Sequence, residues 1–170
     1  MEAGARPGVT LRVHGMGDLG WSIQRHAELY REEFRYLPVF EEYVVRTFAK
    51  FLEHYDAKRD RLWVAELDGR RVGSVAIHHD PDQPGWCKFR WFFVEKEARG
   101  QGIGSALHRT ALDFARHAGY KGVWLWTVDD LHDARKQYER LGFRLVHTED
   151  KPCEWAPWGR EQRWELPFTS

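Results

Sequence analysis

Apolar and polar positions follow a strand period in some segments of the chain and a helix period in others. The stretch Val9 to His14 alternates and predicts a first strand, closed by the glycine-rich turn 15–20. Two amphipathic helices are expected next, with Asp18 as the N-cap of the first and Pro38 just before the second. Their apolar stripes are Ile23, Ala27, Tyr30 and Phe34, and then Phe40, Val44, Phe48, Phe51 and Tyr55.

The middle of the chain changes to a strand period. Two β-rich runs within 61–79 flank Asp68-Gly69, a dipeptide that favours a two-residue hairpin turn because it tolerates positive φ. A loop containing Pro81 and Pro84 follows. Lys88 to Val94 is then a long β-type run whose end is more apolar than strict alternation, which is typical of an interior strand.

The last third repeats this alternation of helices and strands. A helix is expected up to Gly119, with the stripe Ile103, Leu107, Thr110, Ala111, Phe114 and Ala118. A strand at Val123 to Val128, a short helix ending at Gly142, and strands at Phe143 to Thr148 and Gln162 to Leu166 complete the pattern. The order predicts a mixed α/β or α+β sheet layered with helices, in one domain over 9–168 behind a flexible N-terminus of residues 1–8.

Composition narrows the class of protein. The 170 residues carry 26 Lys+Arg and 26 Asp+Glu, so the formal net charge is zero and nucleic-acid binding is not expected. Apolar residues make up 42%, with nine tryptophans, which is enough for a sizeable core. No apolar run approaches the roughly 20 residues of a membrane-spanning helix, and residues 1–8 lack the apolar centre of a signal peptide. The sequence therefore predicts a cytoplasmic protein without membrane contact.

Cysteine and histidine spacing gives no indication of a metal site. Cys87 and Cys153 stand far apart, and the nine histidines form no HExxH pair on a helix face. Both cysteines are expected to be ordinary reduced thiols, and no metal is expected.

The segment 99–104, Arg-Gly-Gln-Gly-Ile-Gly, lies between a predicted strand and a predicted helix. Glycines allow a tight turn, and the free N–H groups and positive dipole end of the helix favour an anion such as a pyrophosphate. A phosphate-binding loop of the Walker type needs a lysine that Gly104-Ser105-Ala106 lacks. A dinucleotide fingerprint needs glycine where Ser105 stands.

The same segment resembles the Arg/Gln-x-x-Gly-x-Gly/Ala signature of the GNAT acyltransferases, with Arg99, Gly102 and Gly104 at the fixed positions. Downstream, 134–143 resembles that family's Ala-x-x-x-Tyr-x-x-x-Gly-Phe segment. Stretches at 17–21, 25–30, 124–127 and 164–166 extend the resemblance over about 9–168, to the acetyltransferase half of proteins that fuse a MarR-type DNA-binding domain to a GNAT domain. The resemblance implies a mostly antiparallel sheet with helices on both faces, without the DNA-binding half.

For function, the resemblance implies acetyl transfer from acetyl-CoA to a small-molecule or peptide amine by direct attack, in a monomer or homodimer. Tyr138 matches the tyrosine that protonates the departing thiolate. Many relatives carry asparagine where this chain has Leu131, a contact that Asp129 or Asp130 would replace unless they cap the short helix. The residues implied in donor binding are Phe92, Phe93, Val94, Arg99, Gly100, Gln101, Gly102, Ile103, Gly104, Ser105 and Thr127.

The acceptor side is less well defined by the sequence. An amine must lose a proton before or during attack, which calls for a carboxylate, an imidazole or a water chain. Candidate bases are His26, Glu28, Glu33, His78 and His79. We expect Tyr30 and Arg90, with His26 and Glu33, to shape the acceptor pocket, and Trp155 and Trp158 to lie near it. The alternative to an enzyme is a non-catalytic module that binds or senses acyl-CoA.

Overall fold

A computed structural model describes residues 8–169 of the chain. The predicted N-terminus, 1–8, lies outside these residues except for Gly8. In chain order the elements are β1 (Val9–Val13), α1 (Asp18–Phe34), α2 (Val39–Glu53), β2 (Arg61–Leu67), β3 (Arg70–His79), β4 (Trp86–Val94), the 3-10 turn η1 (Lys96–Ala98), α3 (Ile103–His117), β5 (Gly122–Val128), α4 (His132–Arg140), β6 (Arg144–Thr148) and β7 (Glu161–Pro167). The predicted series of strands and helices is confirmed.

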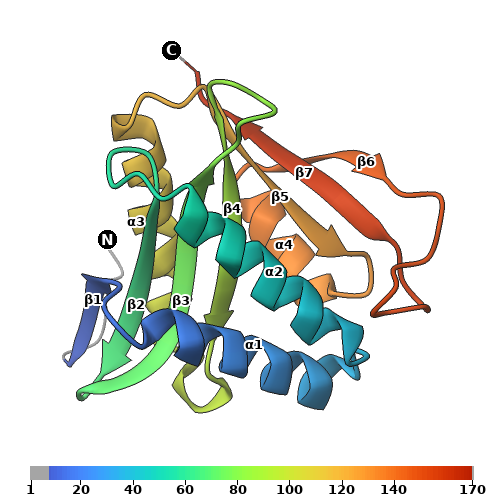
Figure 1. Cartoon of the computed structure of the whole chain (residues 1–170), viewed down its shortest axis with the longest axis horizontal. Coiled ribbons are helices and arrows are strands. Elements are labelled where there is room, and N and C mark those ends of the chain that lie inside the picture. Colours follow the sequence, from blue (N-terminus) through green and yellow to red (C-terminus); the bar gives the residue numbers. More distant parts are fainter. Residues whose placement is uncertain (1–7, 170) are drawn as a thin grey trace.

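Within the described residues the strands form one seven-stranded sheet in the order β1-β2-β3-β4-β5-β7-β6. Neighbours pair antiparallel except β4 and β5, which run parallel. The predicted mixed, mostly antiparallel sheet is therefore confirmed. Helices α1 and α2 cross the near face in Figure 1, and α3 and α4 lie behind it, so each face has its own helical layer.

Each layer has its own apolar core. Behind the sheet, buried Leu107 and Ala111 of α3 pack with Val75 and Ile77 of β3. In front, Phe48 and Phe51 of α2 pack on Trp91 of β4, with Phe48 stacked on Trp91 at 3.8 Å between ring centroids. Because side chains alternate between the faces of a strand, β3 and β4 supply residues to both cores.

The hairpin between β2 and β3 turns where the sequence predicts. Asp68 and Gly69 both have positive φ, 50° and 77°, as a type I′ turn requires. Gly119 and Gly142, at φ 85° and 93°, follow α3 and α4 closely and end them as expected.

The prediction that Asp18 caps the first helix is wrong. The N-cap is Gly17, at φ 91°, and Asp18 is the first helical residue. Its carboxylate instead accepts the N–H of Gly15 at 2.6 Å and pairs with Arg12 at 2.6 Å and Arg71 at 3.3 Å. These contacts, the Arg12 hydrogen bond above all, lower the pKa of Asp18 to about 2. Asp18 therefore pairs with Arg12 of β1 and Arg71 of β3, and its side chain does not cap the helix.

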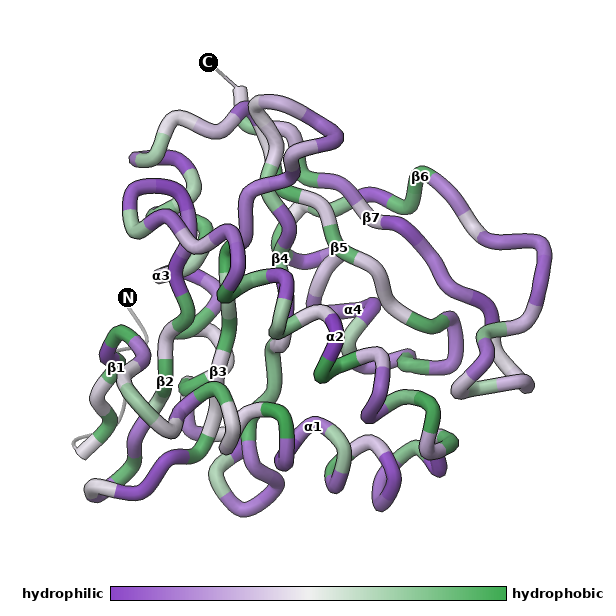
Figure 2. Tube along the Cα trace, viewed as in Figure 1, coloured by the Kyte–Doolittle hydropathy of each residue, from purple (hydrophilic) through white to green (hydrophobic). Residues whose placement is uncertain are grey.

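Hydropathy follows this layering. In Figure 2 the hydrophobic segments gather in the strands and helices of the centre, whereas the arm formed by β6, β7 and their connection is largely hydrophilic. Among residues 8–169, no helix is both long enough and apolar enough to cross a membrane.

Candidate active site

The site lies where β4 and β5 separate. The two strands pair from Trp86 opposite Gly122 to Lys88 opposite Trp124, and beyond this point they diverge. Strand β5 continues with β7 as its partner, whereas β4 continues with β3. The sheet therefore opens between its two faces at the second half of β4, which is where the sequence predicts donor-binding residues.

A β-bulge at Trp91 shapes this part of β4. The register against β3 shifts between Ser74 and Ala76, and Trp91 has φ 51°, in the left-handed region. The Ser74 hydroxyl donates to the Trp91 carbonyl at 2.8 Å, and the Ser22 hydroxyl of α1 lies 3.2 Å from that of Ser74. A bulge turns backbone groups out of the strand ladder, so β4 offers main-chain polar groups at the opening.

A cleft of about 740 Å³, called the rear cleft below, lies between the end of β4, the 99–105 loop, α4 and the second half of α1. Gly102 is the N-cap of α3 at φ 80°, and α3 begins without a side-chain cap. The first N–H groups of the helix therefore remain available for an anion. Of the predicted donor-binding residues, the cleft is lined by Phe92, Phe93, Val94, Arg99, Gly100, Gly102, Ile103, Gly104 and Ser105.

The two remaining donor predictions lie elsewhere. Thr127 of β5 lines the cavity in front of the sheet, and the Gln101 side chain, which contacts the Glu97 carbonyl at 3.5 Å, is not part of the cleft wall. Gln101 is therefore a donor candidate through its backbone, as a member of the loop.

Arg99 fastens the loop to the rest of the molecule. Its guanidinium donates to both carboxylate oxygens of Glu33 on α1, at 2.8 and 2.6 Å, and to the Val94 carbonyl at 2.9 Å. These hydrogen bonds lower the pKa of Glu33. Glu33, a predicted acceptor residue and base, thus lies on the wall of the donor cleft as the partner of a cation.

The cleft also holds polar atoms that suit a pantetheine arm. Leu131, which replaces the usual asparagine, is buried and lines the cleft. Beside it, Asp130 accepts the Trp158 indole N–H with Oδ2 at 2.8 Å, while its Oδ1 is buried without a partner. Nε2 of His108 on α3 is likewise buried and unpartnered. Asp130 Oδ1 can accept an amide N–H, so it fits the role of the missing asparagine, and neither Asp129 nor Asp130 caps α4.

In front of the sheet lies a smaller cavity of about 120 Å³, bounded by α1, α2, β4, β5 and the loop before β7. It contains the predicted acceptor residues His26, Tyr30 and Arg90, together with Trp155. Trp158 is exposed, outside the lining of this cavity, and its indole N–H donates to Asp130. The front cavity and the cleft share five lining residues, so they meet at the β4–β5 opening: Tyr30, Phe92, Leu131, Ala134 and Tyr138.

Tyr138 of α4 is placed at that meeting point. Its side chain is buried, with 8% exposed, and packs edge-on against Phe143 and Phe89. Burial raises the pKa of its phenol further above 10, so Tyr138 is a hydrogen donor at neutral pH.

His26 of α1 is 3% exposed, and burial lowers its pKa to about 4. Nδ1 lies 2.7 Å from the Ser22 carbonyl, which can only accept, so Nδ1 carries the hydrogen and Nε2 is the free acceptor. Its ring packs edge-on against Phe93 at 4.9 Å. A neutral imidazole at the opening can orient an amine, although a pKa this low makes it a weak base.

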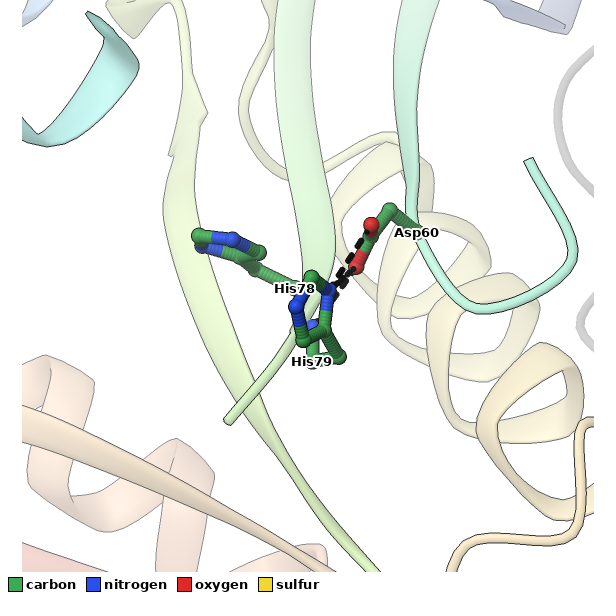
Figure 3. Close-up of side chains that lie close together, drawn as sticks. All are labelled: Asp60, His78 and His79. Carbon is green, nitrogen blue, oxygen red and sulfur yellow. Dashed lines mark hydrogen bonds and ion pairs between the residues drawn. The ribbon is translucent and has the colours of Figure 1, made fainter. Parts of the chain in front are cut away.

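The other candidate bases lie away from both cavities. Glu28 is held by Arg25 on the surface of α1. His79 binds the buried Asp60 carboxylate through Nδ1 at 2.9 Å, and Figure 3 shows His78 pointing away from that pair. Ligand atoms of Asp60, His78 and His79 come within 4.8 Å of one another, but Asp60 already accepts the backbone N–H groups of His79 and Asp56. We therefore read the group as a structural hydrogen-bonded pair with a neighbouring ring.

Two residues that line the front cavity were not predicted from the sequence. Glu161 stands one position before the predicted last strand, and Tyr36 lies in the short connection between α1 and α2. Neither belongs to a motif, and each reaches the cavity only through the tertiary fold.

The chain matches the model of the acetyltransferase (GNAT) family over residues 23–143. This segment contains the glycine loop, Tyr138 and most of both cavities. The chain belongs to the GNAT family. Its Leu131 is therefore a departure within an established family.

Similarity to known proteins supports this membership. The chain is 36% identical over 91 residues to the probable N-acetyltransferase camello of Xenopus tropicalis, covering 54% of this chain and 42% of that protein. It is 42% identical over 90 residues to the N-acetylaspartate synthetase of Danio rerio, covering 52% of this chain and 32% of that protein. The matched segments thus span less than half the length of either relative.

A solved structure shares the GNAT fold over nearly the whole chain. An acetyltransferase of Salmonella typhimurium, solved with acetyl-CoA, superposes with a TM-score of 0.71 at 14% identity, covering 96% of this chain and 95% of that one. At this identity the likeness concerns the fold alone.

Proposed function

We propose that this GNAT domain transfers an acetyl group from acetyl-CoA to an amine by direct attack. The observation that carries the proposal is the meeting of the rear cleft and the front cavity at the β4–β5 opening, beside Phe92 and Tyr138. A donor bound behind the sheet and an amine bound in front of it would face each other there.

In this arrangement acetyl-CoA supplies a thioester, whose C–S bond breaks as the new C–N bond forms. The 99–105 loop and the start of α3 hold the pyrophosphate through backbone N–H groups. Backbone N–H groups of β4 near Phe93 and Val94, next to the bulge, polarise the thioester carbonyl. The Tyr138 hydroxyl hydrogen-bonds the departing sulfur and gives it a proton, and the amine loses a proton on the front side.

Direct attack is favoured because the two thiols are badly placed to act as nucleophiles. Cys87 and Cys153 are buried, and neither lines the cleft or the front cavity. Burial raises the pKa of both, that of Cys153 to about 11, so they are protonated at neutral pH.

The proposal also includes the class of the acceptor. The acceptor is a small-molecule or peptide amine, and the name of the N-acetylaspartate synthetases makes aspartate one amine to test. Location in the cytoplasm, a monomeric or homodimeric state, and kinship with the acetyltransferase half of MarR fusion proteins stay predictions.

Calorimetry and a thiol-release assay test the function together. We expect acetyl-CoA to bind, and free CoA thiol to appear faster when a suitable amine is added from a panel of amino acids, polyamines, aromatic amines and peptides. Binding without amine-dependent thiol release across the whole panel would favour the non-catalytic acyl-CoA sensor instead.

A further inference from the structure

The front cavity carries one unpaired charge of each sign. Arg90 of β4 and Glu161 of β7 both line it and both are half-buried. Within residues 8–169 neither forms an ion pair, with the other or with a third residue, whereas the neighbouring Lys88 pairs with Asp80 at 3.6 Å. Charged groups that are partly removed from water normally have a partner, so these two point to a ligand that supplies the missing charges.

The negative end of the cavity lies at the β4–β5 opening. The sheet register places Glu161 opposite Val128, at the end of β5 that has separated from β4. Tyr36 lies nearby, 5% exposed, and its hydroxyl is buried without a hydrogen-bond partner. The ionisable side chains around this pair are Tyr30, Asp130, Cys153, Glu149 and Glu154. None of them is a cation, so a carboxylate and an unpartnered hydroxyl together suit an ammonium group.

The positive end of the cavity lies at the middle of β4. Arg90 stands opposite Ala76, just before the bulge, and its guanidinium lies 5.7 Å from the centroid of the Trp91 ring. The ionisable groups around it are His78, whose pKa burial lowers to about 4, Lys88, and the carboxylates of Asp60 and Asp80. Asp60 pairs with His79, and Asp80 pairs with Lys88. Because both carboxylates already have partners, Arg90 is left with a guanidinium that can bind an anionic group of a ligand.

Aromatic side chains line much of the rest of the cavity. Trp124 and Trp126 of β5 form one side, and Tyr43 stacked on Trp155 at 4.5 Å forms another. Such walls pack against an apolar or flat body and gain little from a purely polar one.

We propose that the acceptor is an aminocarboxylate with an apolar or aromatic body, its amino group held by Glu161 and Tyr36 and its carboxylate by Arg90. This inference rests on the proposed acetyl transfer and names its substrate class. Glu161 takes one proton from the ammonium, and the resulting amine forms the C–N bond at the opening while the C–S bond breaks. The second proton that the nitrogen loses replaces the one that Tyr138 gives to the departing sulfur.

The test uses matched amines in the thiol-release assay with the full chain. Phenylalanine, tryptophan and leucine are each compared with the amine that lacks only the carboxylate: phenethylamine, tryptamine and isoamylamine. We expect kcat/KM to be at least about 10-fold higher for the best amino acid than for its partner, since a buried charged hydrogen bond is lost with the carboxylate.

Two variants test which end of the cavity binds the carboxylate of the acceptor and which end binds its amino group. In Arg90→Gln the preference for the amino acid should disappear, because the carboxylate has lost its partner. In Glu161→Gln, kcat/KM should fall about 10-fold or more for both members of a pair. Exposed Arg144→Gln and Glu53→Gln serve as matched controls, and an unchanged affinity for acetyl-CoA by calorimetry establishes that each variant is folded.

The outcomes separate the two proposals. If decarboxylated amines or peptides react as well as the amino acids, or if Arg90→Gln keeps the preference, the substrate class is wrong while acetyl transfer stands. If no amine at all releases thiol from bound acetyl-CoA, the proposed function itself fails.

Discussion

The rear cleft and the front cavity, on the two sides of the β4–β5 opening, take their binding groups from different parts of the protein. The rear cleft takes its donor-binding groups largely from the backbone of one continuous loop, 99–105, and from the start of α3. The front cavity takes its groups from side chains on α1, α2, β4, β5 and β7, brought together from across the chain. One side presents a general anion site, and the other presents individual charges and rings.

This difference indicates how the two sides tolerate change. Backbone N–H groups keep their chemistry when a side chain is replaced, provided that the loop conformation survives. The front cavity changes its chemistry with each substitution. Donor binding should therefore depend on conformation at a few glycines, and acceptor choice should depend on residue identity.

Tyr138 belongs to both sides, so its replacement should give the largest effect. Tyr138→Phe removes the hydroxyl that stabilises the departing sulfur and keeps the ring packing. We expect kcat to fall by about 100-fold, the lower end of what a positioned general acid contributes, with little change in acetyl-CoA affinity. Rapid-mixing and steady-state kinetics measure the first quantity and calorimetry the second.

Tyr55→Phe is the matched control, since Tyr55 packs against His14 and Phe51 away from both cavities. A Tyr138→Phe enzyme that turns over at the unmodified rate would remove this tyrosine from the mechanism.

The rear side was predictable because its signal is contiguous. Arg99, Gly102 and Gly104 stand within six positions, between an apolar strand and an amphipathic helix, and the folded loop lies where that order predicts. The Asp68-Gly69 turn was equally predictable, since a positive φ at both positions is a requirement of the turn itself. Local requirements leave a local pattern.

The front side was only partly predictable because its parts are distant in sequence. Arg90, Tyr36 and Glu161 come together only after β5 has paired with β7 and the α1–α2 connection has packed beside them. Asp18 follows this reason only in part: Arg71, which binds its carboxylate, lies 53 positions away, whereas Arg12 lies only six positions away. The same reason explains why the pairing of Glu33 with Arg99, 66 positions away, could not be predicted from the sequence.

Buried imidazoles give the rear side a pH dependence. Burial between aromatic rings lowers the pKa of His108 to about 4, below the roughly 6.5 of an unfolded chain. Between these values the unfolded state binds more protons, so the free energy of unfolding falls as the pH drops from 6.5 to 4 and is unaffected above pH 7. In His108→Phe, the decrease in the free energy of unfolding should be smaller by an amount on the order of 2 kcal/mol.

Urea unfolding of the wild type and His108→Phe at pH 7.5 and 4.5 measures the difference. Exposed His54→Phe is the control and should keep the wild-type dependence. Parallel losses in all three proteins would show that His108 is not held neutral by burial.

Gly102 tests whether donor binding depends on loop conformation. A Cβ added there meets nothing within 4 Å. Gly102→Ala therefore adds only the conformational free energy of holding a non-glycine residue at φ 80°. That cost is about 1–2 kcal/mol, which predicts a roughly 10-fold weaker binding of acetyl-CoA with an unchanged KM for the acceptor. Gly20→Ala, in open space on α1 at an ordinary φ, is the control. Equal affinities in both variants would contradict the role of the loop conformation.

The smallest effect is expected at Arg99, which supports the loop through its side chain. Arg99→Lys keeps the charge but loses the two-pronged contact with Glu33 and the bond to the Val94 carbonyl. Since the pair is partly exposed, we expect acetyl-CoA affinity to fall only about 3-fold, with acceptor KM unchanged. Exposed Arg109→Lys on α3 is the control. A change in acceptor KM without a change in donor affinity would mean that the loop and the front cavity are coupled, and the two sides would then have to be treated as one.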